Sequence, residues 1–519
     1  MKKTIFFILI SILLFSSCRE GTNSDQTIID DSTYREPYRP QLHFTPEAKW
    51  MNDPNGLVFH NGEYHLFYQH YPDSTVWGPM HWGHAVSSDL IHWQHLPIAL
   101  YPDSLGYIFS GSAVVDKGNR SGFGTADNPP LVAIYTYHDA EKEKTGSIAY
   151  QTQGIAYSLD NGRKWTKYEN NPVLANPGIK DFRDPKVLWH APTGKWVMIL
   201  AVLDHVELYA SSDLKSWTKL SEFGKNYGAH GGVWECPDLF PLIIEGEGKQ
   251  KWVMLVSINP GGPNVGSATQ YFIGEFDGKT FTPDTDNSDV KWIDWGQDNY
   301  AGVTFANAPS DRKIFVGWMN NWAYAQIVPT EKWRGAATLP RELGLVNVDG
   351  KNFIRSTVIP ELLKFAADTI VFTNVEISDS LDLTAEVKFP LGTSIIQGVA
   401  DAKSFSFELT NKMNQKLSVG YDSKNNKFFV DRSKSGKNDF SKDFRGIVWA
   451  DRYASADSLA FTIVVDIGSI EVYFDGGLTV MTNLFFADTP METLKLYATD
   501  GAVNVSNLEV RKLPSVWNR

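Results

Sequence analysis

Short apolar runs, each ended by Gly, Asn, Asp or Pro, dominate the chain from His43 to about Leu345 and restrict what it can fold into. These runs are rich in β-branched and aromatic residues, which is typical of strands, and no long segment shows the apolar period of a helix. The sequence therefore predicts an all-β fold. Clear examples are Glu63–Tyr68, Leu131–Tyr137, Trp196–Val202, Lys251–Ser257 and Lys313–Trp318.

A weak internal repeat narrows this prediction. A Ser/Asp turn that leads to a Trp recurs about every 50 to 70 residues, at Ser88–Trp93, Ser158–Trp165 and Ser212–Trp217, with a fainter copy at Phe276–Phe281. Recurring four-stranded blades of a β-propeller would produce this spacing, although two packed sheets with the same turns remain an alternative. A propeller brings one end of each innermost strand to a central pocket, so residues far apart in the sequence can meet there.

The pattern changes after Trp333–Glu342. Residues 355–366 fit a short helix or a bridging segment, and from about residue 370 the chain alternates apolar and polar residues. Ile470–Phe474 followed by Asp475-Gly476-Gly477 indicates a hairpin. We therefore expect a propeller over residues 38–345, a linker over 346–369 and a β-sandwich over 370–519, with the sandwich packing against the propeller rather than binding carbohydrate.

The amino terminus has the features of an export signal. Lys2 and Lys3 precede the apolar run Ile5–Phe15, which is too short to span a membrane, and Ser16-Ser17-Cys18 follows. This end resembles a bacterial lipobox, although Phe15 stands where Leu is usual. We predict a lipoprotein signal peptide over residues 1–18, lipidation of Cys18 and a polar tether over residues 19–37, with plain secretion as the alternative. The protein would then be lipid-anchored, at the periplasmic face or the cell surface.

Composition excludes some classes of partner and cofactor. The net charge of −12 argues against nucleic acid, which requires a basic face. The 17 Trp residues suit a surface that stacks on sugars, although β-rich cores also use aromatic residues. His81 and His84 lie only three residues apart, but no Cys or carboxylate set completes a metal site there. No metal and no organic cofactor is expected, and with Cys18 lipidated the second cysteine, Cys236, has no disulfide partner.

Three acidic residues lie beside prolines in aromatic surroundings. Asp53 lies in Trp50–Gly56, Asp184 in Asp181–Lys186 and Glu235 in Trp234–Asp238. A proline restricts the backbone of the residue before it, so these carboxylates are held in a fixed setting. Singly they fit a surface turn, a surface ion pair and a solvated Glu.

Together, the three acids fit glycoside hydrolysis. This reaction needs one ionised carboxylate and one protonated carboxyl group on either side of the scissile bond, and groups about 5 Å apart retain the anomeric configuration. Backbone N–H groups of Asn55 and Gly56 would keep Asp53 ionised. Asp184 and Arg183 would grip adjacent hydroxyls of a sugar.

The combined motifs resemble glycoside hydrolase family 32, the β-fructofuranosidases. The matching stretches are Trp50–Gly56, Phe109–Ser112, Phe182–Pro185 and Glu235–Asp238, and the resemblance runs from about residue 40 to residue 517. It implies a five-bladed propeller followed by a β-sandwich, with Asp53 as nucleophile and Glu235 as acid/base. Asp184, helped by Arg183, would stabilise the transition state. The implied sugar contacts are Asn52, Gln69, Trp77, Phe109, Ser110 and Trp318, of which the three aromatic residues fit a core role equally well.

Other stretches are similar to exo-acting bacterial and fungal inulinases and levanases, among them His81–His84 and Gly317–Trp322. The expected function is release of terminal β-D-fructofuranosyl units from levan, inulin, fructo-oligosaccharides or sucrose, with retention. Alternatives are an endo-acting levanase or inulinase, a fructosyltransferase, an inverting propeller glycosidase and a non-catalytic fructan-binding lipoprotein. The preference between β-2,1 and β-2,6 linkages and the oligomeric state are left open.

Overall fold

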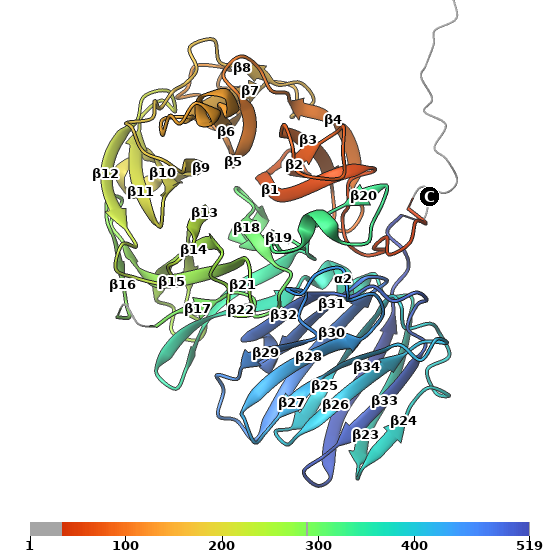
Figure 1. Ribbon diagram of the computed structural model, residues 1–519. Coiled ribbons are helices and arrows are strands. Elements are labelled where there is room, and N and C mark those ends of the chain that lie inside the picture. The colour runs from red at the N-terminus through yellow and green to blue at the C-terminus, as the bar shows by residue number, and fades with distance from the viewer. Residues whose placement is uncertain (1–33, 287–288, 518–519) are drawn as a thin grey trace, which may run out of the picture. The chain divides into compact units, whose positions relative to one another are not determined.

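The structure is a computed structural model that describes residues 34–286 and 289–517 (Figure 1). The signal peptide predicted over residues 1–18, with Cys18, and the tether as far as residue 33 lie outside the described residues. Within the described part, no helix has the length and apolar character needed to cross a membrane.

Five antiparallel sheets form a ring in the first part of the chain, each with its first strand nearest the axis (Figure 1). Parallel pairing of Lys49 and Trp50 with Trp333 and Arg334 joins the first sheet to the chain that follows the fifth sheet's second strand. The sheets are, in order, β1 (Lys49–His60), β2 (Glu63–Tyr71), β3 (His81–Ser87), β4 (Gln94–Leu100) with β20 (Trp333–Arg334); β5 (Tyr107–Val115), β6 (Leu131–His138), β7 (Gln151–Ser158), β8 (Thr166–Lys167); β9 (Phe182–His190), β10 (Lys195–Val202), β11 (His205–Ser211), β12 (Thr218–Phe223); β13 (Val233–Ile243), β14 (Gln250–Asn259), β15 (Ala268–Phe276), β16 (Phe281–Pro283) with β17 (Lys291–Trp292); and β18 (Tyr300–Thr304), β19 (Ile314–Trp318), β21 (Arg341–Val348), β22 (Lys351–Val358).

The repeated Ser/Asp turns join the third and fourth strands of successive blades. In the first blade Ser87 Oγ accepts the Leu90 N–H at 2.8 Å, and in the third Ser211 Oγ accepts the Leu214 N–H at 2.8 Å. Asp277 caps the corresponding turn of the fourth blade by accepting the Lys279 N–H at 2.8 Å. Side chains that bond their own backbone in this way stabilise tight turns. The repeat is therefore a blade repeat, as the sequence predicts.

The second part of the chain is a sandwich of two six-stranded sheets. Its core is a single apolar cluster that includes Phe407, Phe428, Ile463 and Leu496. One sheet has the order β23 (Asp368–Ile377), β34 (Val503–Lys512), β25 (Ser394–Asp401), β30 (Ser458–Asp466), β31 (Ser469–Phe474), β32 (Thr479–Leu484). The other has the order β24 (Ser380–Asp382), β33 (Thr493–Ala498), β26 (Phe405–Thr410), β27 (Lys416–Asp422), β28 (Lys427–Lys434), β29 (Ile447–Asp451).

Helices in the described residues are short. The structure also differs from the linker expected over residues 346–369. The strand β22 pairs with β21 along its whole length, so the fifth blade continues to Val358, and α2 and β23 follow almost at once. Buried and partly exposed residues alternate over Ile354–Val358, as expected of a strand with one face packed, although polar and apolar residue types do not alternate there. The helices are α1 (Ala140–Lys144), α2 (Pro360–Lys364) and the 3₁₀ turns at Ala191–Thr193, Pro309–Asp311, Ala325–Ile327 and Asp475–Gly477.

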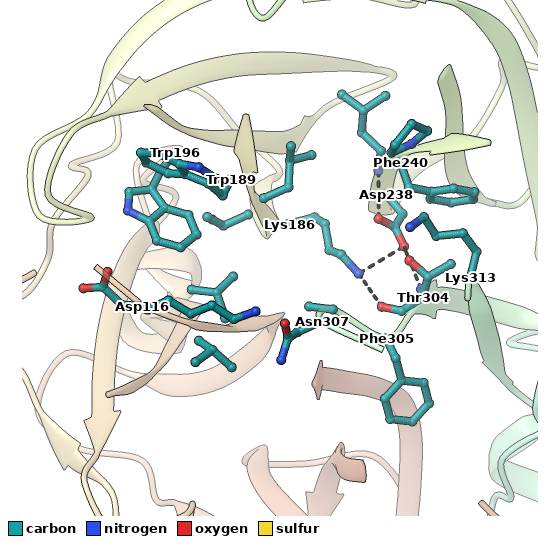
Figure 2. A pocket seen from close by; sticks show the side chains of 18 of the residues that line it. Asp116, Lys186, Trp189, Trp196, Asp238, Phe240, Thr304, Phe305, Asn307 and Lys313 are labelled. Atoms are coloured by element: carbon teal, nitrogen blue, oxygen red, sulfur yellow. Dashed lines mark hydrogen bonds and ion pairs between the residues drawn. The ribbon is translucent and has the colours of Figure 1, made fainter. Parts of the chain in front are cut away.

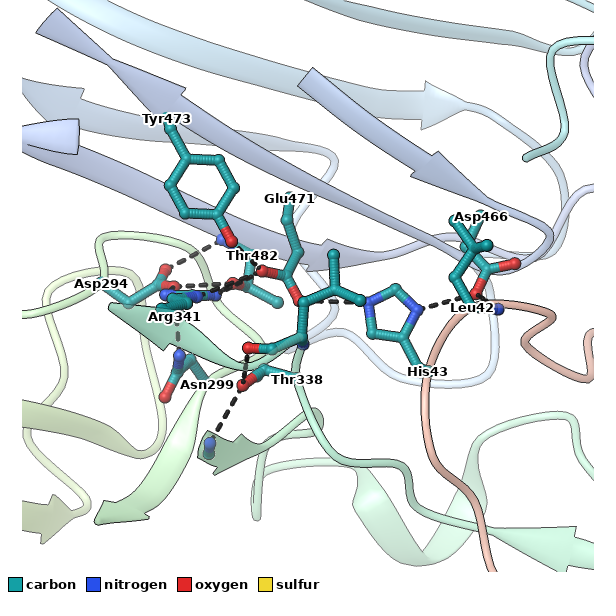
Figure 3. A network of polar contacts seen from close by, with 12 residues as sticks. Leu42, His43, Asp294, Asn299, Thr338, Arg341, Asp466, Glu471, Tyr473 and Thr482 are labelled. Carbon is teal, nitrogen blue, oxygen red and sulfur yellow. Dashed lines mark hydrogen bonds and ion pairs between the residues drawn. The ribbon is translucent and has the colours of Figure 1, made fainter. Parts of the chain in front are cut away.

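Buried ion pairs join the propeller to the sandwich (Figure 3). Arg341 of β21 donates to Glu471 of the sandwich at 2.8 Å and to Asp294 of the propeller at 2.7 Å. His43, at the start of the propeller, lies between Glu471 and Asp466. All of these side chains are buried, so the two parts share a continuous polar interface.

Candidate active site

The first strand of every blade departs from regular pairing near the same end of the propeller axis. Bulges of this kind bend a strand and redirect its side chains. The shifts lie between Met51 and Pro54 in β1, Ile108 and Gly111 in β5, Arg183 and Lys186 in β9, Glu235 and Asp238 in β13, and Tyr300 and Val303 in β18.

Prolines explain three of these bulges. Pro54, Pro185 and Pro237 cannot donate a ladder hydrogen bond, so pairing is interrupted where each proline stands. Asp184 and Cys236, which precede two of them, have φ angles of 64° and 44°. A non-glycine residue with positive φ carries strain that the surrounding structure must hold, and such strain is concentrated at functional sites.

Asp53 lies on β1 with three donors around its carboxylate. Ser110 Oγ donates to Oδ2 at 2.6 Å, Asn52 Nδ2 donates to Oδ1 at 2.9 Å, and the Cys236 thiol lies 3.4 Å from Oδ2. Burial raises the pKa of Asp53, and the charge of Glu235 raises it further, while the three donors act in the opposite direction. The sequence analysis assigned these donors to the backbone N–H groups of Asn55 and Gly56. In the structure, side chains of three different strands supply them instead.

Asp184 lies on β9, next to Asp53. Its Oδ2 accepts the Cys236 N–H at 3.1 Å and lies 3.7 Å from the Cys236 sulfur. Burial raises the pKa of Asp184 to about 7, with Arg183 opposing this and the charges of Glu235 and Asp53 adding to it. Cys236 therefore contacts two of the three predicted acids.

Glu235 lies on β13 and is held by two partners. Arg183 donates to Oε1 from Nη2 at 2.9 Å and from Nε at 3.2 Å, and the Tyr300 hydroxyl donates to Oε2. The Glu235 side chain is 20% exposed, so it remains accessible. Arg183 also donates to Asp181 at 2.6 Å and lies 4.0 Å from Asp184. One guanidinium thereby links two of the three predicted acids.

The aromatic residues among the predicted sugar contacts lie in two places. Phe109 stacks on His138 with ring centroids 4.2 Å apart and meets the partly exposed Trp77 edge-on at 6.0 Å. Trp318 is fully buried against Trp50, whose indole N–H donates to Asn52.

Two buried donors belong to the same set of predicted contacts. Gln69 Nε2 and Trp318 Nε1 are both buried and have no hydrogen-bond partner among the described residues.

Tyr300 and Asp181 are functional candidates that sequence reasoning missed. Tyr300 opens β18 and is the fifth blade's contribution to the site. No carboxylate and no proline marks it, and the one available signal is its place at the start of an innermost strand. The structure also explains the His81–His84 stretch, in which His84 bonds His65 at 3.1 Å and stacks on Phe67.

One cluster in the described residues has the composition of a metal site, namely His205, Glu207 and Glu222 on β11 and β12. Lys219 and Tyr209 both donate to Glu207, and Lys219 also pairs with Glu222. Lys225 pairs with Glu222 as well, so two ammonium groups already neutralise the two carboxylates, and the set does not fit a cation.

Family models match nearly the whole described chain. Residues 43–356 match the glycosyl hydrolases family 32 N-terminal domain, and residues 362–512 match the family 32 C-terminal domain. The levanase of Bacillus subtilis is 45% identical over all of this chain and 76% of its own length. The extracellular exo-inulinase of Aspergillus niger is 39% identical over 93% of this chain and 96% of its own.

Solved structures that resemble this chain come from the same kind of enzyme as the sequence relatives. The exo-inulinase from Aspergillus awamori superposes with a TM-score of 0.83 at 35% identity, over 93% of this chain and 100% of its own. The fructofuranosidase from Schwanniomyces occidentalis, solved with fructose, gives a TM-score of 0.83 at 32% identity over 94% and 100%. The predicted propeller-and-sandwich fold and the predicted family are confirmed: this chain is a glycosidase that belongs to glycosyl hydrolase family 32.

Proposed function

We propose that this protein is a retaining exo-glycosidase that releases terminal fructose from levan, inulin, fructo-oligosaccharides and sucrose. The observation that carries the proposal is the meeting of Asp53, Asp184 and Glu235 from three different blades around the Cys236 thiol and the Arg183 guanidinium. The substrate class is that of the similar levanase and exo-inulinases.

In the first step, Asp53 attacks the anomeric carbon of the terminal fructose while Glu235 gives its proton to the leaving oxygen. A fructosyl ester on Asp53 and a free leaving sugar result. In the second step, ionised Glu235 takes a proton from water, and the hydroxide formed displaces Asp53. The donors Ser110, Asn52 and Cys236 stabilise the carboxylate that is released.

Asp184 and Arg183 serve the sugar ring rather than the bond that breaks. A carboxyl group beside a guanidinium offers acceptors and donors to neighbouring hydroxyls. Trp77 and Phe109 offer aromatic faces, and the unpartnered N–H groups of Gln69 and Trp318 supply further donors for hydroxyls. Asn52 and Ser110 are shared between Asp53 and the substrate.

Digestion of levan, inulin and sucrose side by side, with products resolved by size, tests the exo assignment. Fructose as the only early product is expected, whereas a ladder of oligosaccharides would identify an endo-acting enzyme. Longer oligosaccharides formed at high sucrose would identify a transferase. NMR of the first-formed fructose anomer tests retention, and inversion would contradict the covalent step.

The Asp53→Asn variant separates an enzyme from a fructan-binding protein. Loss of turnover with unchanged retention on a levan column is expected, because the amide keeps the shape of the site but is no nucleophile. Unchanged turnover would exclude Asp53 as the nucleophile.

We also propose that the protein is exported and anchored through lipidated Cys18. Levanase and extracellular exo-inulinases are among the similar proteins, which supports export. The test is fractionation of cells that express the full chain or its Cys18→Ala variant. We expect the full chain with the membranes and the variant in the soluble fraction, and the opposite pattern would exclude the anchor.

A further inference from the structure

Besides the acid cluster, the propeller has a cavity lined by residues that follow the acids along the innermost strands (Figure 2). Its volume is about 490 Å³, and it is lined by the later residues of the same innermost strands that carry the acids, including Val114 of β5, Leu188 of β9 and Phe240 of β13. Four strand positions separate Asp184 from Leu188, which corresponds to at most about 13 Å along the strand. The cavity is therefore distinct from the acid cluster.

A polar plug closes the axis between the two sites. Lys186 donates to Asp238 at 3.0 Å and to the Thr304 carbonyl at 2.6 Å, as Figure 2 shows. Lys186 and Asp238 are both buried. Lys186 and Asp238 both line the cavity, and along their strands they lie between the acids and the rest of its lining.

The carboxylates that line this cavity already accept several hydrogen bonds from neighbouring protein groups. Asp238 accepts from Leu239 N–H and from both the N–H and the hydroxyl of Thr304 in addition to Lys186. Asp116 accepts from Arg120 N–H and from the N–H and hydroxyl of Ser121. Asp238 thus accepts four hydrogen bonds and Asp116 three, so most of the acceptor capacity of the two carboxylates is already used.

The cationic side chains Lys313, Arg120 and Lys117 of the lining, in contrast, have few polar partners. Lys313 Nζ donates to the Asp311 carbonyl at 3.1 Å, and Arg120 lies over the Trp189 ring at 4.3 Å. Neither these two residues nor Lys117 pairs with a carboxylate among the described residues. Burial lowers the pKa of Lys313, the charges of Asp311 and Asp238 raise it, and the charge of Lys186 lowers it; the net direction is down, so an anion beside Lys313 would stabilise its charged form.

Aromatic side chains form much of the remaining wall. Trp189, Trp196, Phe240 and Phe305 line the cavity (Figure 2), and Trp252 is a further lining residue. A volume of several hundred Å³ with aromatic walls and a few charged groups is typical of sites for small organic ligands. We infer that this cavity binds a small organic anion, whose carboxylate or phosphate group contacts Lys313 and whose ring lies against the tryptophans.

Calorimetric titration of the full chain, saturated with fructose so that the proposed active site is filled, tests this inference. The probes are benzoate, fructose 6-phosphate and inorganic phosphate, with benzamide as the neutral counterpart of benzoate. At least one acidic probe is expected to bind with a dissociation constant below about 1 mM. Comparison of benzoate with the two phosphate probes distinguishes a carboxylate ligand from a phosphate ligand. Binding of benzamide as tight as that of benzoate, or no binding of any acidic probe at about 10 mM, would overturn the inference.

Two variants locate the site. Lys313→Gln removes the charge, and Ala306→Phe fills the cavity but keeps every charge. Each is expected to weaken binding about tenfold or more, because a charge-assisted hydrogen bond or the ring contact is lost. Lys249→Gln, whose side chain is 75% exposed on the same blade as Trp252, is the matched control and should bind normally. Sucrose hydrolysis by Lys313→Gln should equal that of the unaltered enzyme, which shows that the variant is folded. Unchanged affinity in both cavity variants would place the ligand elsewhere and contradict the inference.

Discussion

The Cys236 thiol lies between two carboxylates that repel each other. Burial raises the pKa of Cys236 well above its usual value, and the charges of Asp184 and Asp53 raise it further, so the thiol stays neutral and acts as a donor. Its sulfur lies 3.4 Å from Asp53 and 3.7 Å from Asp184. Because the thiol is small and is a weak hydrogen-bond donor, it can lie between the two acids without holding either of them in its ionised form.

Tyr300→Phe should slow turnover without weakening substrate binding. The Tyr300 hydroxyl donates to Glu235, and a hydrogen bond to a charged group is worth about 1.5–3 kcal/mol. We expect kcat on sucrose to fall about tenfold or more with KM changed less than about twofold, because Glu235 loses the partner that orients it. Steady-state kinetics give both constants.

Tyr324→Phe is the matched control for Tyr300→Phe. The Tyr324 hydroxyl also donates to a buried carboxylate, that of Asp298, but at the interface between propeller and sandwich. This variant should lose stability and keep its kcat. Equal kinetic effects in the two variants would show that Tyr300 acts only through the stability of the fold.

Asp184→Asn should stabilise the protein at pH 8 while abolishing hydrolysis. The pKa of Asp184 is about 7 in the folded state, above its ordinary value, so the native state carries a cost wherever this group is ionised. That cost is complete above pH 7 and shrinks progressively as the pH falls from 7 toward the ordinary value of 3.8. An Asn at this position should raise the free energy of unfolding at pH 8 by about 2–4 kcal/mol.

Urea denaturation at pH 8 and pH 5 measures this effect. The difference between Asp184→Asn and the unaltered protein should shrink at pH 5, where Asp184 itself is protonated. A variant that is less stable than the unaltered protein at pH 8 would contradict a raised pKa at this position.

At the residue scale, proline and aromatic neighbours were sufficient to predict Asp53, Asp184 and Glu235 as candidates. Tyr300 could not be predicted in this way, because its role depends on β18 lying beside β13 in the ring, and tyrosines are common in strands. The donors around Asp53 were equally out of reach, since Ser110 and Cys236 are 57 and 183 residues away.

At the scale of elements, the bulges of the innermost strands position the site. Each proline ends the regular pairing just where an acid or its neighbour must turn toward the axis. In β1 the bulge also needs Gly56, which has a φ of +54° and lies against Phe67 and Trp82.

Gly56→Ala should destabilise the first blade and lower activity. A Cβ at this position would lie 2.7 Å from Phe67 Cδ2 and 2.9 Å from Trp82 Cζ3, in a backbone conformation that side chains rarely adopt. We expect a loss of at least about 2 kcal/mol in the free energy of unfolding and a reduced kcat, because Asp53 lies on the same bulge.

Gly62→Ala is the control for Gly56→Ala, since its φ is also positive but no atom lies within 4 Å of the added Cβ. It should cost about 1 kcal/mol of backbone strain and leave kcat unchanged. Chemical denaturation and sucrose hydrolysis compare the two variants. Equal losses in both would mean that the contacts with Phe67 and Trp82 contribute nothing.

The elements themselves were predicted with uneven success, for a physical reason. The Ser/Asp turns use local side-chain bonds, so the sequence carries them directly and the blade repeat could be predicted. The strand β22 is defined by its pairing with β21, and because polar and apolar residues do not alternate over Lys351–Val358 the segment was predicted as part of a linker.

At the scale of the whole molecule, the propeller and the sandwich meet through buried charges. Arg341 bridges Asp294 and Glu471, and Arg432 of the sandwich donates to Asp298 at 2.7 Å (Figure 3 shows the first of these). Breaking one partner of such a pair leaves an uncompensated buried charge, which costs about 3–5 kcal/mol. The two parts are therefore expected to unfold together.

His43 should make this interface sensitive to alkaline pH. Burial alone would lower the pKa of His43, but hydrogen bonds with Asp466 and Glu471 outweigh it and raise the pKa to about 9. The stability that this raised pKa contributes is fully present below pH 6.5 and is lost as the pH rises through 9. The loss should be about 3 kcal/mol.

Calorimetric unfolding between pH 6 and pH 10 measures this loss. The His43→Gln variant should lose much of the decline above pH 6.5, whereas His92→Gln should behave as the unaltered protein because His92 is 51% exposed. A decline of the same size in His43→Gln would assign the alkaline sensitivity to other groups.

The central claim is that Asp53 bonds to the sugar while Glu235 moves the proton, and trapping the covalent species tests it most directly. Fructosyl fluoride needs no protonation to leave, and a Glu235→Gln enzyme cannot activate water, so the ester should accumulate. Peptide mass spectrometry after acid quenching should find one fructosyl unit on the peptide that contains Asp53 and none in the Asp53→Asn, Glu235→Gln double variant. Label on another carboxylate, or fluoride release with no labelled peptide, would contradict the account.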